Sequence, residues 1–312
     1  MKKKTEEIKN EVTYSHEALE RIENNRKGFL ADYRKNNNLK IIISVLCILV
    51  IVVACIVLPY VMPEDMKKLS TGITLGLFVI ALAGTLSASM LTRKAMDKKM
   101  KIYFSDYYKA VNDFVIEGEG FENVALQDPG KITLEEFNEA QVYVNVIEAG
   151  SRGLTTFEYN KIPMRVVDCA GNVKGEKRMM PVFVGKCVSS AAKYAESDLI
   201  LIYLKGNEKA LPPTNVEGLE KVVDDEKMWI AANNKNWEKV ITKDILALIN
   251  EFTMNELLVD LAISLHDGKA FIMMGYDDPL MVLPLQNQFD SKPVEAFKED
   301  FRKAVKLLEA LN

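Results

Sequence analysis

Residue types that commonly perform chemistry are few in this 312-residue chain and stand apart from one another. The two histidines are His16 and His266, and neither has a cysteine or another histidine near it in the sequence. Nucleophilic catalysis of the Ser–His–Asp or Cys–His type needs a base beside the nucleophile. We expect His266 to be exposed on a hairpin turn. His16 is expected to lie in a helix that precedes the long apolar runs described below, beside a membrane. The sequence therefore indicates no site of this type.

Cysteine positions argue against a metal centre. Cys47 and Cys55 fall within a long apolar run, where a thiol behaves as a small apolar group. Cys169 and Cys187 occur in the more polar part of the chain without C-x-x-C spacing. Because zinc requires several converging ligands, we expect no metal and no cofactor, and these thiols fit a reducing compartment.

Two pairs of adjacent acids, Asp224-Asp225 and Asp277-Asp278, lie in turn-like segments where carboxylates are ordinarily solvated. Neither G-x-x-x-x-G-K-[ST] nor G-x-G-x-x-G occurs, so no phosphate-binding loop is indicated. Gly171-x-x-x-Gly175 is expected to connect two strands. If the chain is an enzyme, these motifs leave only a chemistry that uses carboxylates. The methionine pairs at 179–180 and 273–274 are expected to fill the core.

Two apolar runs, Ile41–Val61 and Ser70–Leu91, contain no Lys, Arg, Asp or Glu. Each has the length of a membrane-crossing helix, about 20 residues, and the intervening Met62–Leu69 is long enough only for a tight reversal. We predict a transmembrane helical hairpin. A cleaved signal peptide is the competing interpretation of the first run, but about forty residues precede it, more than a signal peptide has there.

Basic residues flank both runs on the side away from the reversal. The flanking cations include Arg34, Lys35, Lys40, Arg93, Lys94, Lys98 and Lys99, whereas the reversal has Lys67 and Lys68 beside Glu64 and Asp65. Basic flanks favour the cytoplasmic side, so we predict both termini inside and the short reversal outside. The same cations could attract anionic lipids. The formal net charge of −4 and the absence of a basic stripe interleaved with aromatics indicate no nucleic-acid partner.

Residues 1–40 are predicted to form a cytosolic helix over most of their length. Apolar positions alternate in steps of four and three, as in a coiled coil, through Ile8, Val12, Ser15, Leu19, Ile22, Arg26, Phe29 and Tyr33. Two of these positions are polar. The pattern fits either an amphipathic helix on the domain or membrane surface, or self-association.

Small residues share one face of the second run, at Gly72, Gly76, Gly84 and Ala88. Small residues let helix backbones approach closely in lipid, where no hydrophobic force drives helices together. This face packs either on the first run of the same hairpin or on another subunit.

Residues 92–312 are predicted to form a cytosolic α+β domain. The helix leaving the membrane continues to Ile116, and Thr133-Leu-Glu-Glu136 has the form of a capping box. A period of two then indicates strands at 141–148, 156–168, 178–188, 198–204 and 228–232. Helices are expected at 242–252 and 294–311, and a hairpin around Asp267-Gly268. Strands in succession with flanking helices indicate a mainly antiparallel sheet.

Three stretches carry a family resemblance: Thr133-Leu-Glu-Glu-Phe137, Pro181-Val-Phe-Val-Gly-Lys186, and Met228-Trp-Ile-Ala-Ala-Asn233 with the helix and hairpin after it. In these, residues from about 130 to 310 resemble a bacterial two-span membrane-protein family catalogued as a domain of unknown function, often encoded near LemA-type proteins. The resemblance implies a membrane-anchored cytosolic domain in a bacterial cytoplasmic (inner) membrane, and it supplies no catalytic residues. We therefore expect a non-enzymatic protein-interaction or sensing module with a protein partner or self-association. A membrane-surface enzyme using carboxylates and a channel or transporter accessory subunit are the alternatives.

Overall fold

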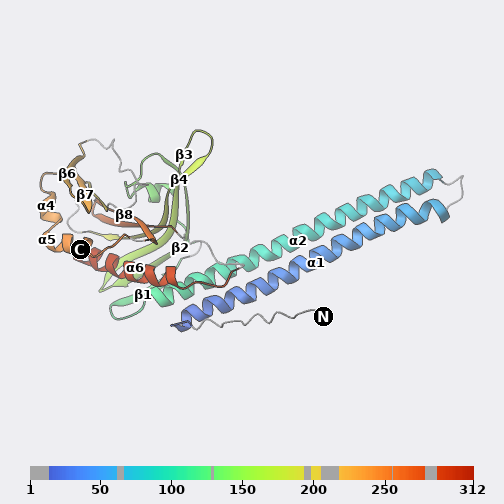
Figure 1. Cartoon of the computed structure of the whole chain (residues 1–312), viewed down its shortest axis with the longest axis horizontal. Coiled ribbons are helices and arrows are strands. Elements are labelled where there is room, and N and C mark those ends of the chain that lie inside the picture. Colours follow the sequence, from blue (N-terminus) through green and yellow to red (C-terminus); the bar gives the residue numbers. More distant parts are fainter. Residues whose placement is uncertain are drawn as a thin grey trace, which may run out of the picture. The chain divides into compact units, whose positions relative to one another are not determined.

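The computed structural model describes residues 14–61, 67–127, 130–192, 198–204, 218–254, 256–277 and 287–312. Within them the chain is α+β, and every strand pair is antiparallel (Figure 1). The elements are, in order, α1 (Glu17–Val61), α2 (Lys67–Val115), β1 (Phe121–Leu126), α3 (Leu134–Asn138), β2 (Val146–Tyr159), β3 (Ile162–Lys174), β4 (Met179–Ala191), β5 (Ile200–Leu204), β6 (Glu220–Asp224), β7 (Met228–Ala232), α4 (Trp237–Val240), α5 (Lys243–Ile249), β8 (Leu258–His266), β9 (Lys269–Tyr276) and α6 (Lys292–Ala310).

The chain divides into two compact units. One comprises residues 21–107 and a short segment that ends at Phe289, and it contains most of α1 and α2. The other comprises the remainder, with the whole sheet and α3 to α6. We refer to them as the helical unit and the sheet unit.

In the helical unit, α1 and α2 form an antiparallel pair (Figure 1). Phe29 stacks on Tyr103 with ring centroids 4.8 Å apart, and Asp32 pairs with Lys99. Nearer the reversal, a Cβ built at Gly84 would lie 3.7 Å from the Cys47 sulfur. A residue early in α1 (Phe29) thus contacts one late in α2 (Tyr103), and a later residue of α1 (Cys47) lies near an earlier one of α2 (Gly84). The two helices therefore run side by side in opposite directions.

Both helices are long and apolar enough to cross a membrane. None of the most apolar 18-residue window of α1 is buried, and only 6% of that of α2 is. Leu75, Ile80 and Leu91 are each more than 60% exposed. Burial within the protein therefore does not account for this apolar surface, and it needs another apolar environment.

The sheet unit is built on one nine-stranded sheet among the described residues, in the order β1-β2-β3-β4-β9-β8-β5-β7-β6. The hairpin formed by β8 and β9 therefore lies in the middle of the sheet, between β4 and β5, although it is the last to occur in the sequence. Successive strand residues face opposite sides, so the sheet has two faces with different coverings.

Helix α6 packs on one face through Phe301, whose ring lies 5.5 Å from that of Phe157 on β2. The same face contains an ion pair between Asp168 and Lys186, which are register partners on β3 and β4. Their side chains are 2% and 5% exposed. Tyr108, near the end of α2, donates a 2.8 Å hydrogen bond to Asp168 and packs over Gly153, where a Cβ would lie 2.4 Å from its ring.

The opposite face carries the main apolar cluster and is partly covered by α3. Phe137 of α3 lies over Gly171 of β3, where a Cβ would come within 2.6 Å of its ring. Val167, Cys187 and Met273 stand in one row across β3, β4 and β9 beneath this cover. We call this the α3 face.

Several sequence predictions hold and others are wrong. The strand at Met228–Ala232 and the hairpin around Asp267-Gly268 are confirmed, as is the capping box at Thr133. The strand predicted at 156–168 is instead a hairpin, because Asn160 and Lys161 take positive φ and reverse the chain. The strand predicted from 141 begins at Val146, and β1 and β6 were not predicted.

Candidate functional site

A cavity of about 820 Å³ opens on the α3 face beside α3. Cavities of this size accommodate small molecules or the side chains of a bound peptide. Its lining residues come from β1, β2, β3, β4, β9, the end of α3 and the β8–β9 turn. We call it the α3 cavity, and all of its lining lies within the sheet unit.

Strand register builds the floor of the α3 cavity. Thr156, Arg165, Ser189 and Phe271 are successive register partners across β2, β3, β4 and β9, so their side chains share one face. Two residues further toward the end of the sheet, Glu158, Pro163, Ala191 and Lys269 form a second row on the same face. One row inward is the apolar line of Val167, Cys187 and Met273. The face thus changes from apolar core to charged rim within three rows.

Helix α3 forms one wall and is fixed by its capping box. The Thr133 hydroxyl accepts from the Glu136 backbone N–H at 3.1 Å, and the Glu136 carboxylate accepts from the Thr133 N–H at 2.7 Å. Ser151 anchors the preceding residue, since its hydroxyl bonds both the N–H and the carbonyl of Ile132. A helix this short depends on such contacts, because few of its backbone groups are satisfied internally.

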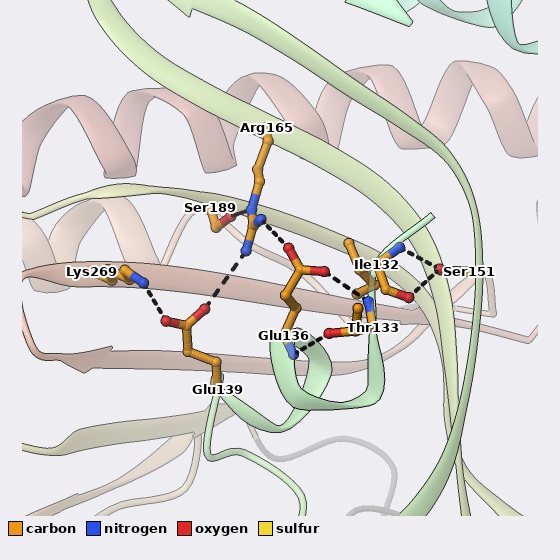
Figure 2. A network of polar contacts seen from close by, with 8 residues as sticks. All are labelled: Ile132, Thr133, Glu136, Glu139, Ser151, Arg165, Ser189 and Lys269. Carbon is orange, nitrogen blue, oxygen red and sulfur yellow. Dashed lines mark hydrogen bonds and ion pairs between the residues drawn. The ribbon is translucent and has the colours of Figure 1, made fainter. Parts of the chain in front are cut away.

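Arg165 is the centre of the polar network shown in Figure 2. Its Nε donates to the Ser189 hydroxyl at 3.0 Å, and one terminal nitrogen donates to Glu136 at 3.1 Å. The other terminal nitrogen lies 3.9 Å from Glu139, which also pairs with Lys269. The guanidinium is therefore held in one orientation by groups from β4 and α3, pre-positioned at the cavity.

The Glu136 carboxylate is stabilised in its ionised form. The hydrogen bond from the Thr133 backbone N–H is the largest cause that lowers the pKa of Glu136, and Arg165 lowers it further. At neutral pH this carboxylate is negatively charged and has its oxygens occupied. It is thus suited to hold charge in place and poorly suited to donate a proton.

Carboxylates outnumber cations around the cavity. Glu136, Glu139, Glu158 and Asp267 line it together with only Arg165 and Lys269. Both cations are already paired with Glu136 or Glu139. Glu158 has no ion pair among the described residues, and Asp267 lies 3.5 Å from the His266 ring. The unneutralised charge of the cavity is therefore negative and lies on the outer rim.

His266 is placed differently from our prediction, which put it exposed on a turn. It is the last residue of β8 and is 4% exposed, and its ring stacks on Phe271 at 5.6 Å. Its Nε2 contacts the carbonyl oxygen of Glu139, so the ring also fixes the end of α3. This strand end beside the turn is buried because the end of α3, remote in sequence, covers it.

The thiols of Cys169 and Cys187 are buried and unreactive in character. Burial raises the pKa of Cys187 to about 12 and the pKa of Cys169 well above its usual range. Neither supplies a thiolate at neutral pH. Among the described residues no cluster of three or more His, Cys, Asp or Glu side chains is arranged to hold a metal ion.

The acid pairs do not gather in one place. Asp224 pairs with Lys221 at 2.9 Å, and Asp225 accepts from two backbone N–H groups of its own turn. Asp277 follows β9, and Asp278 lies outside the described residues. Of the methionine pairs, Met273 and Met274 fill the core as predicted, whereas Met179 and Met180 are 38% and 50% exposed, contrary to the prediction.

The small residues of α2 differ in their surroundings. Gly84 and Ala88 are half-buried, and Gly84 faces Cys47 of α1. A Cβ built at Gly72 or Gly76 meets no other described atom within 4 Å. The part of this face near Gly84 thus packs on α1 of the same chain.

The basic residues that flank the apolar runs lie on the surface of α1 and α2. Six are exposed: Arg34, Lys35, Lys40, Arg93, Lys94 and Lys98. Lys99 is half-buried and pairs with Asp32. In the seam predicted on α1, Leu19, Ile22, Arg26 and Phe29 are buried, whereas Tyr33 is 50% exposed and Ile8 and Val12 lie outside the described residues.

Sequence reasoning missed the residues of the α3 cavity, apart from the Glu136 of the capping box. The signal available was Arg165, a charged residue in a predicted strand on the same face as the apolar Val167. A cation in that position needs a partner. Its partners Glu139 and Ser189 reach it only because α3 packs on the sheet and because β3 pairs with β4 in one particular register. That register is invisible in a period-two pattern.

No protein-family model matches the chain, and no curated protein matches it. Among solved structures, it is similar to the crystal structure of the mycobacterial trehalose monomycolate transport factor A, TtfA, at 8% identity and a TM-score of 0.32. The alignment covers 62% of this chain and 88% of that one. A likeness of this size transfers neither fold nor function. The resemblance to the two-span family stays a prediction, because no family model and no curated protein matches.

Proposed function

We propose that this chain is a membrane-anchored binding protein of a bacterial cytoplasmic membrane. Helices α1 and α2 cross the bilayer as a hairpin with both termini in the cytoplasm. The sheet unit works there as a protein-interaction or sensing module, with the α3 cavity as its binding site. Anionic lipids are attracted by the basic residues beside the two apolar runs.

The observation that carries the proposal is the unburied apolar surface of α1 and α2. Their apolar windows are at most 6% buried, although the rest of the chain forms a separate unit with its own core. An apolar helix exposed along about 20 residues is stable in hydrocarbon, because all its backbone groups bond internally.

Binding is favoured over catalysis by the state of the carboxylates. A carboxylate enzyme would use Glu136 and Glu139, which lie one helical turn apart on the cavity wall. Both are held in ion pairs, and the pKa of Glu136 is lowered, opposite to what a general acid needs. The accessory-channel alternative receives less support, since the runs 41–61 and 70–91 contain no charged residue to line a conduction path.

Cysteine labelling in intact cells tests the anchor and its orientation. In a background with the four native cysteines replaced, Lys4, Lys67 or Lys99 is changed to Cys and treated with a membrane-impermeant maleimide. Labelling at position 67 alone is expected, because the basic flanks hold positions 4 and 99 inside.

Two controls complete this experiment. All three positions must be labelled after the membrane is made permeable, which shows that each cysteine is reactive. The protein must also stay in the membrane fraction after alkaline carbonate washing. Labelling at 99 without 67 would reverse the orientation, and release by carbonate would remove the anchor from the proposal.

A further inference from the structure

We propose that the α3 cavity binds an extended basic segment of a partner polypeptide, with apolar side chains on the cavity floor and Lys or Arg side chains at its rim. This inference rests on the proposed binding function and names the chemistry of the partner. Three features of the cavity carry it: its floor, its charge and one hydroxyl group.

The floor has an apolar part and is wide enough for an extended chain. Pro163, Ala191 and Phe271 contribute to it from three adjacent strands. Neighbouring strands lie about 4.8 Å apart, so the rows from β2 to β9 span roughly 14 Å. A segment of several residues fits across that width, with alternate side chains directed at the floor.

The rim selects the sign of the ligand. Arg165 and Lys269 are occupied by Glu136 and Glu139, so an incoming anion must displace an existing pair. Glu158 and Asp267 add negative charge that has no Lys or Arg partner within 4 Å among the described residues. A cation gains attraction from both without displacing anything, and complementary charge chiefly sets specificity and association rate.

Ser189 provides a hydrogen-bond donor for a backbone carbonyl. It is 6% exposed and lines the cavity. Its oxygen accepts from Arg165 Nε (Figure 2), and its hydroxyl donates no hydrogen bond to another described residue. A peptide carbonyl reaching the floor would satisfy this buried group.

The test uses the full chain in nanodiscs of zwitterionic phosphatidylcholine, which gives a basic probe no anionic lipid to bind. The probe is a fluorescent octapeptide of alternating Leu and Lys, with blocked ends. Two matched peptides replace every Lys by Glu or every Leu by Ala. Anisotropy titrations, with empty nanodiscs as blank, are expected to rank the Leu–Lys peptide well above both.

Two variants locate the binding. Glu158→Gln combined with Asp267→Asn removes the free rim charge and is expected to weaken binding by about 3- to 10-fold, since exposed charge pairs contribute modestly. Glu220→Gln, an exposed acid on β6 at the far edge of the sheet, is the matched control. Ala191→Trp fills the floor without changing charge and is compared with Val222→Trp on β6.

The proposal stands if the Leu–Lys peptide loses affinity in the rim variant and in Ala191→Trp but keeps it in both controls. Equal binding of the Leu–Glu peptide would overturn it, as would unchanged affinity in either cavity variant or an absence of binding. These outcomes are separate from the maleimide and carbonate results. A membrane protein that ignores the peptide refutes this inference alone, and a peptide binder released by carbonate refutes the anchor alone.

Discussion

Glu136 takes part in two structures at once, the capping box of α3 and the ion pair with Arg165. One oxygen closes the helix end and the other holds the guanidinium. The position of the α3 wall and the orientation of the cation are therefore set by the same side chain. A change at Glu136 affects the fold locally and the cavity directly.

Replacing Glu136 by Gln should lower the free energy of unfolding by about 0.5–1 kcal/mol at pH 7, the scale of an exposed ion pair near a helix start. The pKa of Glu136 is lowered in the folded state, so its stabilisation is present above the unfolded pKa of about 4.3 and is lost as pH falls through the folded value. Denaturation at pH 7 and below pH 4 measures the difference. Glu135→Gln, in the same helical turn without an ion pair among the described residues, should show the smaller effect at pH 7, and equal effects would contradict this account.

The buried ion pair of Asp168 and Lys186 should lose more stability than the partly exposed pair of Glu136 and Arg165 when one partner is removed. Lys186→Met leaves a carboxylate without its cation in a site 2% exposed, which typically costs about 3–5 kcal/mol. Adding Asp168→Asn removes that uncompensated charge and should restore most of the stability. Tryptophan fluorescence during denaturation in detergent micelles reports both. A double variant as unstable as the single one would show that geometry, rather than charge, sets the loss.

Individual residues were predictable where their partners are close in sequence. The capping box at Thr133 needs only Glu136, three residues away, and it forms as predicted. Arg165 and Lys269 required the order β3-β4-β9, which brings residues about a hundred positions apart into adjacent rows. His266 was misplaced for the same reason, since its burial depends on α3.

At the scale of elements, α1 and α2 continue well beyond the apolar runs, to 45 and 49 residues. The polar portions pair through aromatic stacking and an ion pair, as between Phe29 and Tyr103. The apolar portions approach closely where Gly84 meets Cys47. The helix pair is thus joined by aromatic and ionic side-chain contacts in its polar portions and by close approach at a small residue in its apolar portions.

Gly84→Leu should disturb this pair, whereas Gly76→Leu should not. The first variant places a side chain against Cys47, 3.7 Å from its Cβ, and the second meets no described atom within 4 Å. Overpacking at Gly84 is expected to lower the free energy of unfolding by about 1–3 kcal/mol, which is measured as a lower melting temperature in detergent. The two leucines are matched in apolarity, so membrane insertion stays equal. A larger effect at Gly76 would instead indicate packing on a second copy of the chain.

Element types were predicted well and their ends poorly. Helix α5 starts after Thr242 as its cap requires, and β8 and β9 flank Asp267-Gly268. The reversal at Asn160 and Lys161 has neither Gly nor Pro, the residues that mark turns most strongly. The long apolar runs were the easiest to identify, because two stretches of about 20 residues without a charged side chain stand out in the sequence.

At the scale of the whole molecule, the main apolar cluster of the sheet unit includes no residue from the apolar runs among the residues that the structure describes. Its main cluster is assembled from α3, the sheet strands and the segments between them. The two units are each compact by contact. The sheet unit therefore does not depend on the apolar runs for its packing.

Replacing residues 41–91 by a Gly/Ser linker of about six residues tests that independence. The linker joins Lys40 to Thr92, close to the point where Asn36 of α1 contacts Met96 of α2. We expect a protein that is monodisperse without detergent and retains the tryptophan fluorescence of the full chain, since the exposed apolar surface of α1 and α2 is gone. Aggregation, or loss of the β-sheet signal in circular dichroism, would show that the spans support the sheet.

The strand order also fixes when the sheet can be completed on the ribosome. Strands β1 to β4 and β5 to β7 are synthesised before the β8–β9 hairpin that lies between them. At about 5–20 residues per second, the β4 edge waits roughly 4 to 17 seconds for β9, with its backbone groups open to wrong pairing. A ribosome that stops between Ala232 and Leu258 releases the strands β1–β4 and β5–β7 without the β8–β9 hairpin that joins them. Premature stop codons even late in the gene should therefore yield aggregating or degraded products rather than shortened, working protein.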